Sequence, residues 1–405
     1  MRGVRAFFRW VLAAAAPAAA ACVAGERPIL VYPATDAAAR AVLRFERALP
    51  VTPPDLFVLR PEERAGVAVD PGRGLVYAAG RGARILAFDA EDGQVRWEID
   101  LGSSDVGSVP VVSPDGRRLF VGTEDGELIA VDLETRSVVF RYQTEGTIRA
   151  PALLYEDLVF FANSHQDVFA LAASDGRWRW QYGREVVADV NTIEGRAGLT
   201  LVPPATPDAA PVLYTCFDDG KVVALGGRSG EPLWITTVAP ATGGPFVDCD
   251  ATPLYLPEDD QIVVTGRATG VWALGAADGV TAWRFPVEGA GTVTRGPGDV
   301  LYVTSSLEGI FAVEKGGRLR WRRAVDPGVV SPALVVGSTV FVTHSEIGLL
   351  AYDGASGETL AVVRTGSGMS SVPVFDPDRG RLFALANRGS IYVFTVLDRP
   401  PGPLG

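Results

Sequence analysis

The sequence predicts an all-β fold, one eight-bladed β-propeller of four-stranded antiparallel blades. The first observation is an apolar strand motif, usually centred on alanine, which recurs eight times. The central residues are at positions 87, 130, 170, 224, 273, 312, 351 and 393, so successive copies are 39 to 54 residues apart. This period is typical of propeller blades, in which each unit buries its apolar faces against its neighbours.

The composition is the second observation. The 405 residues include 46 glycines and 29 prolines, which disfavour long helices and suit short strands joined by turns. Apolar residues make up 47% of the chain, enough for a core. The net charge of −11 argues against binding to nucleic acid, and two histidines leave little for a multi-histidine metal site.

Each repeat carries the signals of four strands, which is the third observation. A proline precedes the first strand in several units, as at Pro110 and Pro332, where a missing N–H costs little. A second apolar strand leads to the repeated motif, and a glycine turn follows it. In five units a tryptophan stands four residues after that glycine, as in Gly176 and Trp180. We expect the glycine to supply the positive φ of a hairpin and the tryptophan to pack between blades.

The ends of the repeat array predict how the ring closes. The last unit, residues 372–396, stops before a fourth strand, whereas residues 55–60 precede the first complete unit and have no other partner. We therefore expect residues 55–60 to be the fourth strand of the last blade, which leaves no open edge in the ring. The predicted propeller spans residues 51–397, and residues 398–405 form a C-terminal tail.

Residues 1–21 have the pattern of a secretion signal. Three arginines precede an apolar run of about 12 residues, which is too short to span a bilayer. The Ala-Ala-Ala-Cys sequence that ends at Cys22 resembles a bacterial lipobox, in which the cysteine is lipidated. This resemblance implies a lipid anchor at Cys22, and Val23 after it implies the outer membrane. The alternative is an ordinary secretory cleavage site.

Residues 22–50 are expected to be a tether between the anchor and the propeller. A helix is expected over residues 36–48, because Val42, Phe45 and Leu49 share one helical face.

The repeat unit resembles that of pyrroloquinoline-quinone-type propellers, over about residues 51–397. These include quinoprotein dehydrogenases and the non-enzymatic BamB lipoproteins of the outer-membrane β-barrel assembly machine. The blade pattern is specific for the fold and not for the function. Two segments favour the BamB family. Residues 241–253 resemble its Ala-Thr-Gly loop followed by Asp-x-Asp-x-Thr-Pro, and Leu199-Thr200-Leu201 resembles its Leu-x-Leu loop.

In the BamB family these loops dock onto a POTRA domain of the barrel-inserting protein. The resemblance implies that Leu199 and Leu201 are apolar anchors and that Asp248 and Asp250 are acidic contacts. Val202 stands where the family pattern has arginine. The two longest repeat spacings fall here, and insertions in repeat proteins gather at binding faces. The alternative is that both leucines belong to an edge strand and both aspartates cap turns.

The sequence contains no recognisable catalytic constellation, so no catalytic residue, metal or cofactor is expected. It has no adjacent cysteine pair of the quinoprotein type and no carboxylate spacing typical of a hard-cation site. Nucleophile-elbow, phosphate-loop and zinc-protease motifs are missing as well. Cys216 and Cys249 are either a disulfide, which an oxidising periplasm permits, or two buried thiols.

The sequence therefore predicts a monomeric, non-enzymatic scaffold lipoprotein on the periplasmic face of the outer membrane. It is expected to bind a POTRA-containing barrel assembly protein and to assist outer-membrane protein assembly, without binding nucleic acid. The alternatives are a propeller that binds another envelope protein or a polysaccharide, and a quinone-dependent dehydrogenase.

Overall fold

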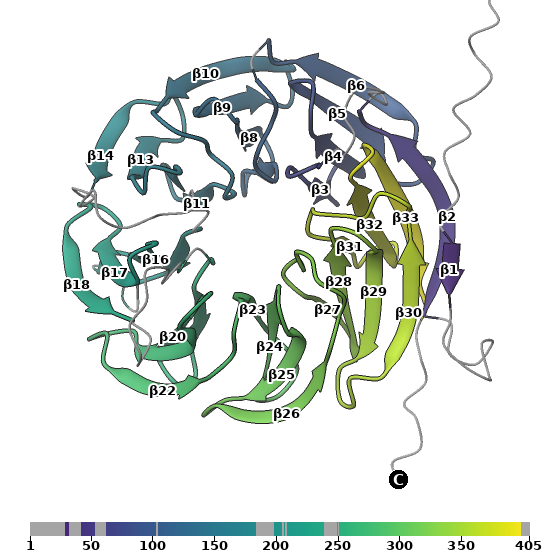
Figure 1. The fold of residues 1–405 in the computed structure, drawn as a ribbon. Helices are drawn as coiled ribbons and strands as arrows, with labels where there is room; N and C mark the ends of the chain where they lie inside the picture. The colour runs from purple at the N-terminus through teal and green to yellow at the C-terminus, as the bar shows by residue number, and fades with distance from the viewer. Residues whose placement is uncertain are drawn as a thin grey trace, which may run out of the picture.

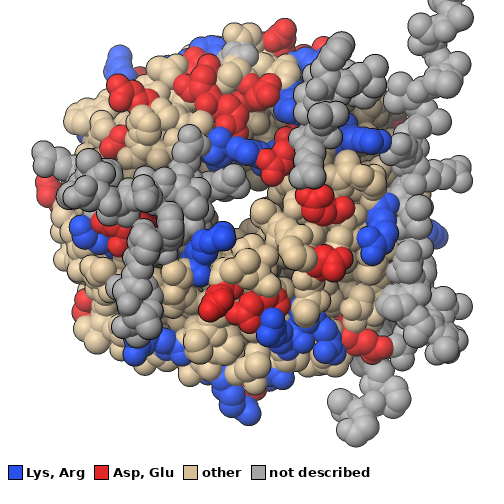
Figure 2. Space-filling model, viewed as in Figure 1, with Lys and Arg blue, Asp and Glu red and all other residues tan. Residues whose placement is uncertain are grey.

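The computed structural model describes residues 29–31, 42–52, 62–102, 104–183, 198–204, 206, 209–238, 249 and 251–397. Within these ranges the regular structure is all β. The strands form eight antiparallel sheets, arranged as the blades of a ring around a central opening (Figures 1 and 2). The predicted eight-bladed propeller is confirmed.

Blades 1 to 4 each contain four strands, numbered from the centre of the ring outward. Blade 1 comprises β3 (Val67–Asp70), β4 (Leu75–Ala79), β5 (Arg84–Asp89) and β6 (Val95–Asp100). Blade 2 comprises β7 (Val111–Val112), β8 (Arg118–Gly122), β9 (Glu127–Asp132) and β10 (Ser137–Gln143). Blade 3 comprises β11 (Leu153–Tyr155), β12 (Leu158–Ala162), β13 (Val168–Ala172) and β14 (Trp178–Tyr182). Blade 4 comprises β15 (Thr200–Val202), β16 (Val212–Cys216), β17 (Lys221–Gly226) and β18 (Pro232–Thr237).

Blades 5 and 6 follow the same order, and blades 7 and 8 each recruit a strand from the N-terminal part of the chain. Blade 5 comprises β19 (Leu254–Leu256), β20 (Gln261–Gly266), β21 (Gly270–Gly275) and β22 (Thr281–Phe285). Blade 6 comprises β23 (Ala290–Arg295), β24 (Val300–Ser305), β25 (Gly309–Glu314) and β26 (Arg318–Arg323). Blade 7 comprises β27 (Leu334–Val336), β28 (Thr339–His344), β29 (Gly348–Asp353), β30 (Thr359–Arg364) and a fifth, outer strand β1 (Ile29–Val31). Blade 8 comprises β31 (Val374–Asp376), β32 (Arg381–Ala386), β33 (Ser390–Val396) and the outer strand β2 (Leu43–Pro50).

The ring is closed by an N-terminal strand, β2, which occupies the position beside β33 that the repeat pattern predicted for residues 55–60; those residues lie outside the described residues. Strand β2 pairs antiparallel with β33 along its whole length (Figure 1). The propeller therefore begins before residue 51, and the expected helix over residues 36–48 is wrong from residue 43 onward. Phe45 and Leu49 pack in two different clusters, on opposite sides of blade 8, so they do not share a face.

The core consists of eight apolar clusters, one between each pair of neighbouring blades. In most blades the repeated alanine allows two aromatic rings to meet across it. Ala170, for example, pairs with Phe160 on one side and Trp180 on the other, and the two ring centroids are 5.9 Å apart. A larger residue at this position would separate the rings, so the small residue and the tryptophan are parts of one packing unit.

A charged cluster supports the closing interface between blades 8 and 1. The Arg381 guanidinium lies 3.0 Å from the Glu46 carboxylate in β2 and 2.9 Å from the Glu91 carboxylate in blade 1, and it donates to the Ala90 carbonyl at 2.7 Å. Burial opposes the ionisation of Glu46, but the Thr395 hydroxyl and the charge of Arg381 outweigh it and lower the pKa of this carboxyl.

The antiparallel order of the strands gives the ring two different edges. One edge, which we call the connection rim, carries the turns between second and third strands and the connections from each blade to the next. The other edge carries the remaining hairpin turns. Because all blades have the same order, residues 198–202 lie at the connection rim at the entrance to blade 4, and residues 249 and 251–253 lie there at the entrance to blade 5.

Candidate partner-docking site

The two segments that the sequence singled out touch each other at the connection rim. The Thr200 hydroxyl, at the start of β15, donates a hydrogen bond to the carbonyl oxygen of Pro253. Gly198 packs so closely against the side chain of Thr252 that a Cβ on this glycine would overlap the hydroxyl. The entrances to blades 4 and 5 therefore form one continuous surface, which we call the blade 4–5 entrance.

The structure gives the two candidate leucines different environments. Leu199 is only 4% exposed and belongs to the apolar cluster between blades 3 and 4, so its side chain packs in the core beneath the rim. Leu201 lies on β15 opposite Leu213 and is half-buried at the edge of the same cluster. Of the two, Leu201 alone has a side chain that a partner could reach without unpacking the blades.

A disulfide fixes the second segment to blade 4. Cys216, at the end of β16, is bonded to Cys249, with Cα atoms 5.6 Å apart, and both side chains are fully buried. The bridge closes a sequence separation of 33 residues and ties the end of the connection before β19 to the neighbouring blade. It therefore restricts the movement of the chain immediately before Pro253.

Three candidate residues cannot be placed. Asp248, Asp250 and Cys22 lie outside the described residues. Within the part of the chain that the structure describes, no group of three or more histidine, cysteine, aspartate or glutamate side chains could hold a metal ion. In the same residues, no helix is long and apolar enough to cross a membrane.

Buried polar groups close to the blade 4–5 entrance serve the structure. The Tyr214 hydroxyl donates to the Ala276 carbonyl of blade 5 at 3.0 Å, and burial, with a contribution from the Asp260 carboxylate, raises its pKa to about 12. This phenol therefore remains a hydrogen-bond donor at neutral pH. Asp218 is also buried, where it accepts a hydrogen bond from the Gln166 amide of blade 3 at 3.1 Å. These contacts join blade 4 to blade 5 and to blade 3.

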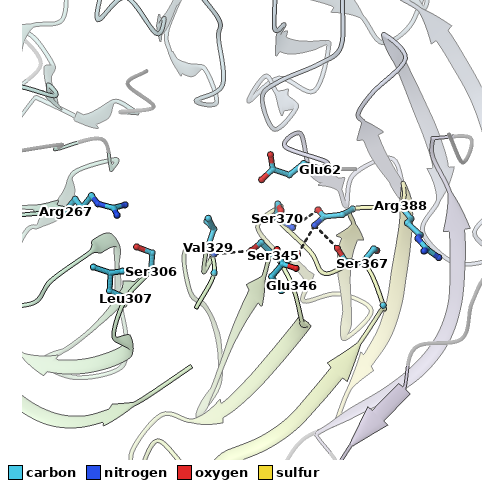
Figure 3. A pocket seen from close by; sticks show the side chains of 13 residues that line it. Glu62, Arg267, Ser306, Leu307, Val329, Ser345, Glu346, Ser367, Ser370 and Arg388 are labelled. Atoms are coloured by element: carbon cyan, nitrogen blue, oxygen red, sulfur yellow. Dashed lines mark hydrogen bonds between the residues drawn. The ribbon is translucent and has the colours of Figure 1, made fainter. Parts of the chain in front are cut away.

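The sequence reasoning missed a pocket on the same rim. It has a volume of about 640 Å³ and lies between the turns and connections of blades 5 to 8, beside the central opening (Figure 3). Arg267, Leu307, Val329 and Glu346 line it. These residues come from turns that differ from one blade to the next, so the repeat pattern gave no signal for them.

The repeat architecture defines a pyrroloquinoline-quinone-type repeat propeller, and the blade 4–5 entrance is its candidate site. The chain belongs to the family described as outer membrane protein assembly factor BamB, whose model matches residues 56–115, 106–268 and 267–396.

Individual relatives agree with this membership. Outer membrane protein assembly factor BamB of Burkholderia pseudomallei is 26% identical over 334 residues, which cover 79% of this chain and 81% of the relative. The crystal structure of BamB from Moraxella catarrhalis has a TM-score of 0.70 and 19% identity, covering 87% of this chain and all of that one. Quinohemoprotein alcohol dehydrogenase from Comamonas testosteroni matches with a TM-score of 0.68 and 15% identity, covering 91% and 78% of the two chains. Both likenesses to solved structures show the shared fold alone.

Proposed function

We propose that this protein is a non-enzymatic scaffold in the assembly of outer-membrane proteins. The match to the BamB family along nearly the whole propeller carries this conclusion. A rigid ring of eight blades can hold a partner in a fixed orientation without chemistry on a substrate. The barrel assembly machinery is the corresponding partner, and the periplasmic side of the outer membrane is the corresponding location.

The finer proposal is that the blade 4–5 entrance docks a POTRA domain. The contact between Thr200 and Pro253 supports it, because it brings the two family-like segments into one surface. Leu201 supplies apolar area there, and Asp248 and Asp250 supply charge that selects a basic or amide partner. Leu199 supports this surface from below.

Anchoring through a lipidated Cys22 completes the proposal. A single acyl chain gives only marginal membrane binding, so the multiple acyl chains of a bacterial lipoprotein are needed for a durable tether. The test is mass spectrometry of the mature N-terminus from membranes. A diacylated or triacylated Cys22 supports the anchor, and an unmodified N-terminus contradicts it.

The docking site is tested by affinity capture from detergent-solubilised membranes. Wild-type protein is expected to retain a POTRA-containing barrel protein, and Leu201→Asp or Asp250→Arg to lose most of it. The matched control is Leu233→Asp, which places the same charge at an apolar residue of β18 that is 58% exposed.

The outcomes separate the alternatives. Capture by the wild type and the control, but not by Leu201→Asp, supports both the assembly role and its site. Capture by all variants would show that the interface lies elsewhere on the ring. Capture of another envelope protein or a polysaccharide instead contradicts the assembly role. It would support the alternative function, a propeller that binds one of those partners.

A further inference from the structure

Buried polar side chains fix the walls of the pocket that is formed by the turns and connections of blades 5 to 8. The Asn387 side chain is buried beneath it, where its Oδ1 accepts the N–H of Ser370 at 3.1 Å and its Nδ2 donates to the carbonyls of Ser345 and Ser367 at 3.1 and 3.0 Å. One amide thereby ties the turn of blade 8 to the turn of blade 7 and to the connection between those blades.

A buried histidine fixes the blade 7 side of the pocket. The Nδ1 of His344 accepts the N–H groups of Glu346 and Ile347 at 3.1 and 3.3 Å. This leaves Nε2 to donate to the Asp326 carbonyl at 2.9 Å, so the ring joins the turn to the connection from blade 6. Ser345 and Val329 then exchange two hydrogen bonds, of 3.0 and 3.1 Å. The wall is therefore formed before any ligand arrives, which lowers the entropy cost of binding.

The pocket combines an available cation with exposed apolar surface. Figure 3 shows Arg267 extending from blade 5 toward Ser306 and Leu307 of blade 6, with Val329 beyond them. Among the described residues, the Arg267 guanidinium forms no ion pair with a carboxylate. Leu307 is 57% exposed and Val329 is 50% exposed, and both line the same pocket.

The opposite end of the pocket carries charges of both signs. Glu346, Glu62 and Arg388 line it on the side of blades 7 and 8, away from Arg267 (Figure 3), and the Glu62 carboxylate pairs with Arg64 at 2.9 Å. Arg267 is the lining cation that lies beside the exposed Leu307 and Val329 (Figure 3), so a ligand with an apolar group next to its negative end has a preferred orientation, with that end on Arg267. The volume is in the range of small-ligand sites and suits the last few residues of an extended chain.

We propose that this pocket binds the carboxyl-terminal end of an extended polypeptide. The terminal carboxylate pairs with Arg267, and the last, apolar side chain packs on Leu307 and Val329. The chain then leaves toward Glu346, where a basic or uncharged residue is favoured over an acidic one. This site is separate from the blade 4–5 entrance and extends the proposed function by a second binding activity.

The test uses purified full-length protein and short fluorescent peptides that end in leucine, with either a free carboxylate or a terminal amide. Fluorescence anisotropy is expected to show that amidation weakens binding about tenfold, equivalent to about 1.4 kcal/mol. Arg267→Gln is expected to bind both peptides equally and weakly. Leu307→Ser is expected to weaken both peptides while keeping the preference for the carboxylate.

The control is Arg177→Gln, which removes a highly exposed arginine on the other edge of the ring and leaves both affinities unchanged. Equal binding of the two peptides by wild-type protein, or a preference that survives Arg267→Gln, overturns the proposal. It is also overturned if inorganic phosphate competes as well as the peptide and a peptide ending in serine binds equally, since the site is then a general anion site. None of these outcomes bears on the capture experiment at the blade 4–5 entrance.

Discussion

The indole of Trp180 in blade 3 lies directly against Gly230 in the third hairpin turn of blade 4. The Nε1 of Trp180 donates to the Gly227 carbonyl of the same turn at 3.1 Å. A Cβ on Gly230 would stand 2.6 Å from the indole ring carbons, and the backbone here has a φ of +74°. Trp234 meets Gly279, and Trp321 meets Gly357, in the same way. Glycine is therefore required at these positions for two reasons. The turn needs a positive φ, and the neighbouring indole leaves no room for a Cβ.

Gly230→Ala separates the two requirements when it is compared with Gly298→Ala. Gly298 also has a positive φ, +67°, but nothing lies within 4 Å of its missing Cβ. We expect Gly298→Ala to cost about 1–2 kcal/mol through backbone strain alone. Gly230→Ala is expected to cost about 2–4 kcal/mol, because it also displaces the indole. Urea midpoints measure both, and equal losses would show that the ring contact is unimportant.

The repeat architecture could be predicted because each blade repeats the same local requirement. The small central residue, the turn glycine and the tryptophan stand at fixed spacings, since the same packing unit recurs in successive blades. In five units the tryptophan contacts the hairpin of the next blade, as expected from its size.

The closing strand could not be predicted from apolar spacing. Strand β2 has a bulge between Phe45 and Arg47, which breaks the alternation of the strand. The interruption places apolar residues three and four apart, a spacing that also occurs on a helix. The pairing with β33 is a contact between residues far apart in the sequence, so only the tertiary structure selects the strand.

The candidate site was only partly predictable for a similar reason. The family-like loops identified the blade 4–5 entrance, and the two segments do meet there. The burial of Leu199 depends on blade 3, which packs against it from a distant part of the chain. The pocket with Arg267 combines turns of four blades, none of which carries a recognisable motif.

Arg381→Met is expected to lower the stability of the ring by about 2–3 kcal/mol, because it leaves the partly buried Glu46 carboxylate without its main cation. The double variant with Glu46→Gln is expected to recover part of the loss, which a double-mutant cycle in urea measures. Arg322→Met provides the comparison, since its partner Glu308 forms a more exposed pair. A cycle with no coupling energy contradicts a role for this pair in closure.

Asp89 provides a prediction for acid pH. The Arg96 guanidinium, followed by the Asp92 backbone N–H, lowers the pKa of Asp89 from 3.8 to about 2. Its contribution to stability is therefore complete above pH 3.8 and is lost as the pH falls through about 2. Asp89→Asn keeps the turn hydrogen bonds and is expected to cost about 0.5–1 kcal/mol at pH 7, because the pair is screened by solvent. Unfolding midpoints of both proteins should converge near pH 2, and a constant difference would contradict this assignment.

The disulfide is expected to contribute about 3–4 kcal/mol, from the loop-closure entropy of its 33-residue separation. Replacing both Cys216 and Cys249 by alanine removes this contribution, and a reducing agent should lower the wild-type midpoint toward that of the variant. The variant itself should not respond to the reductant. If the bridge also orders the blade 4–5 entrance, the variant loses capture of the barrel protein under conditions in which the ring stays folded.

The different burial of Leu199 and Leu201 separates folding from docking. Leu199→Ala removes a side chain from the cluster between blades 3 and 4, and we expect a loss of about 2–4 kcal/mol. Once folded, this variant should still capture its partner, because the rim surface is retained. Leu201→Asp should behave in the opposite way, with most binding lost and a smaller loss of stability, since its side chain is half-buried. Urea unfolding measures the loss of stability in each variant, and affinity capture measures the loss of binding. Equal effects of the two substitutions on capture would mean that Leu201 acts through the fold and does not contact the partner.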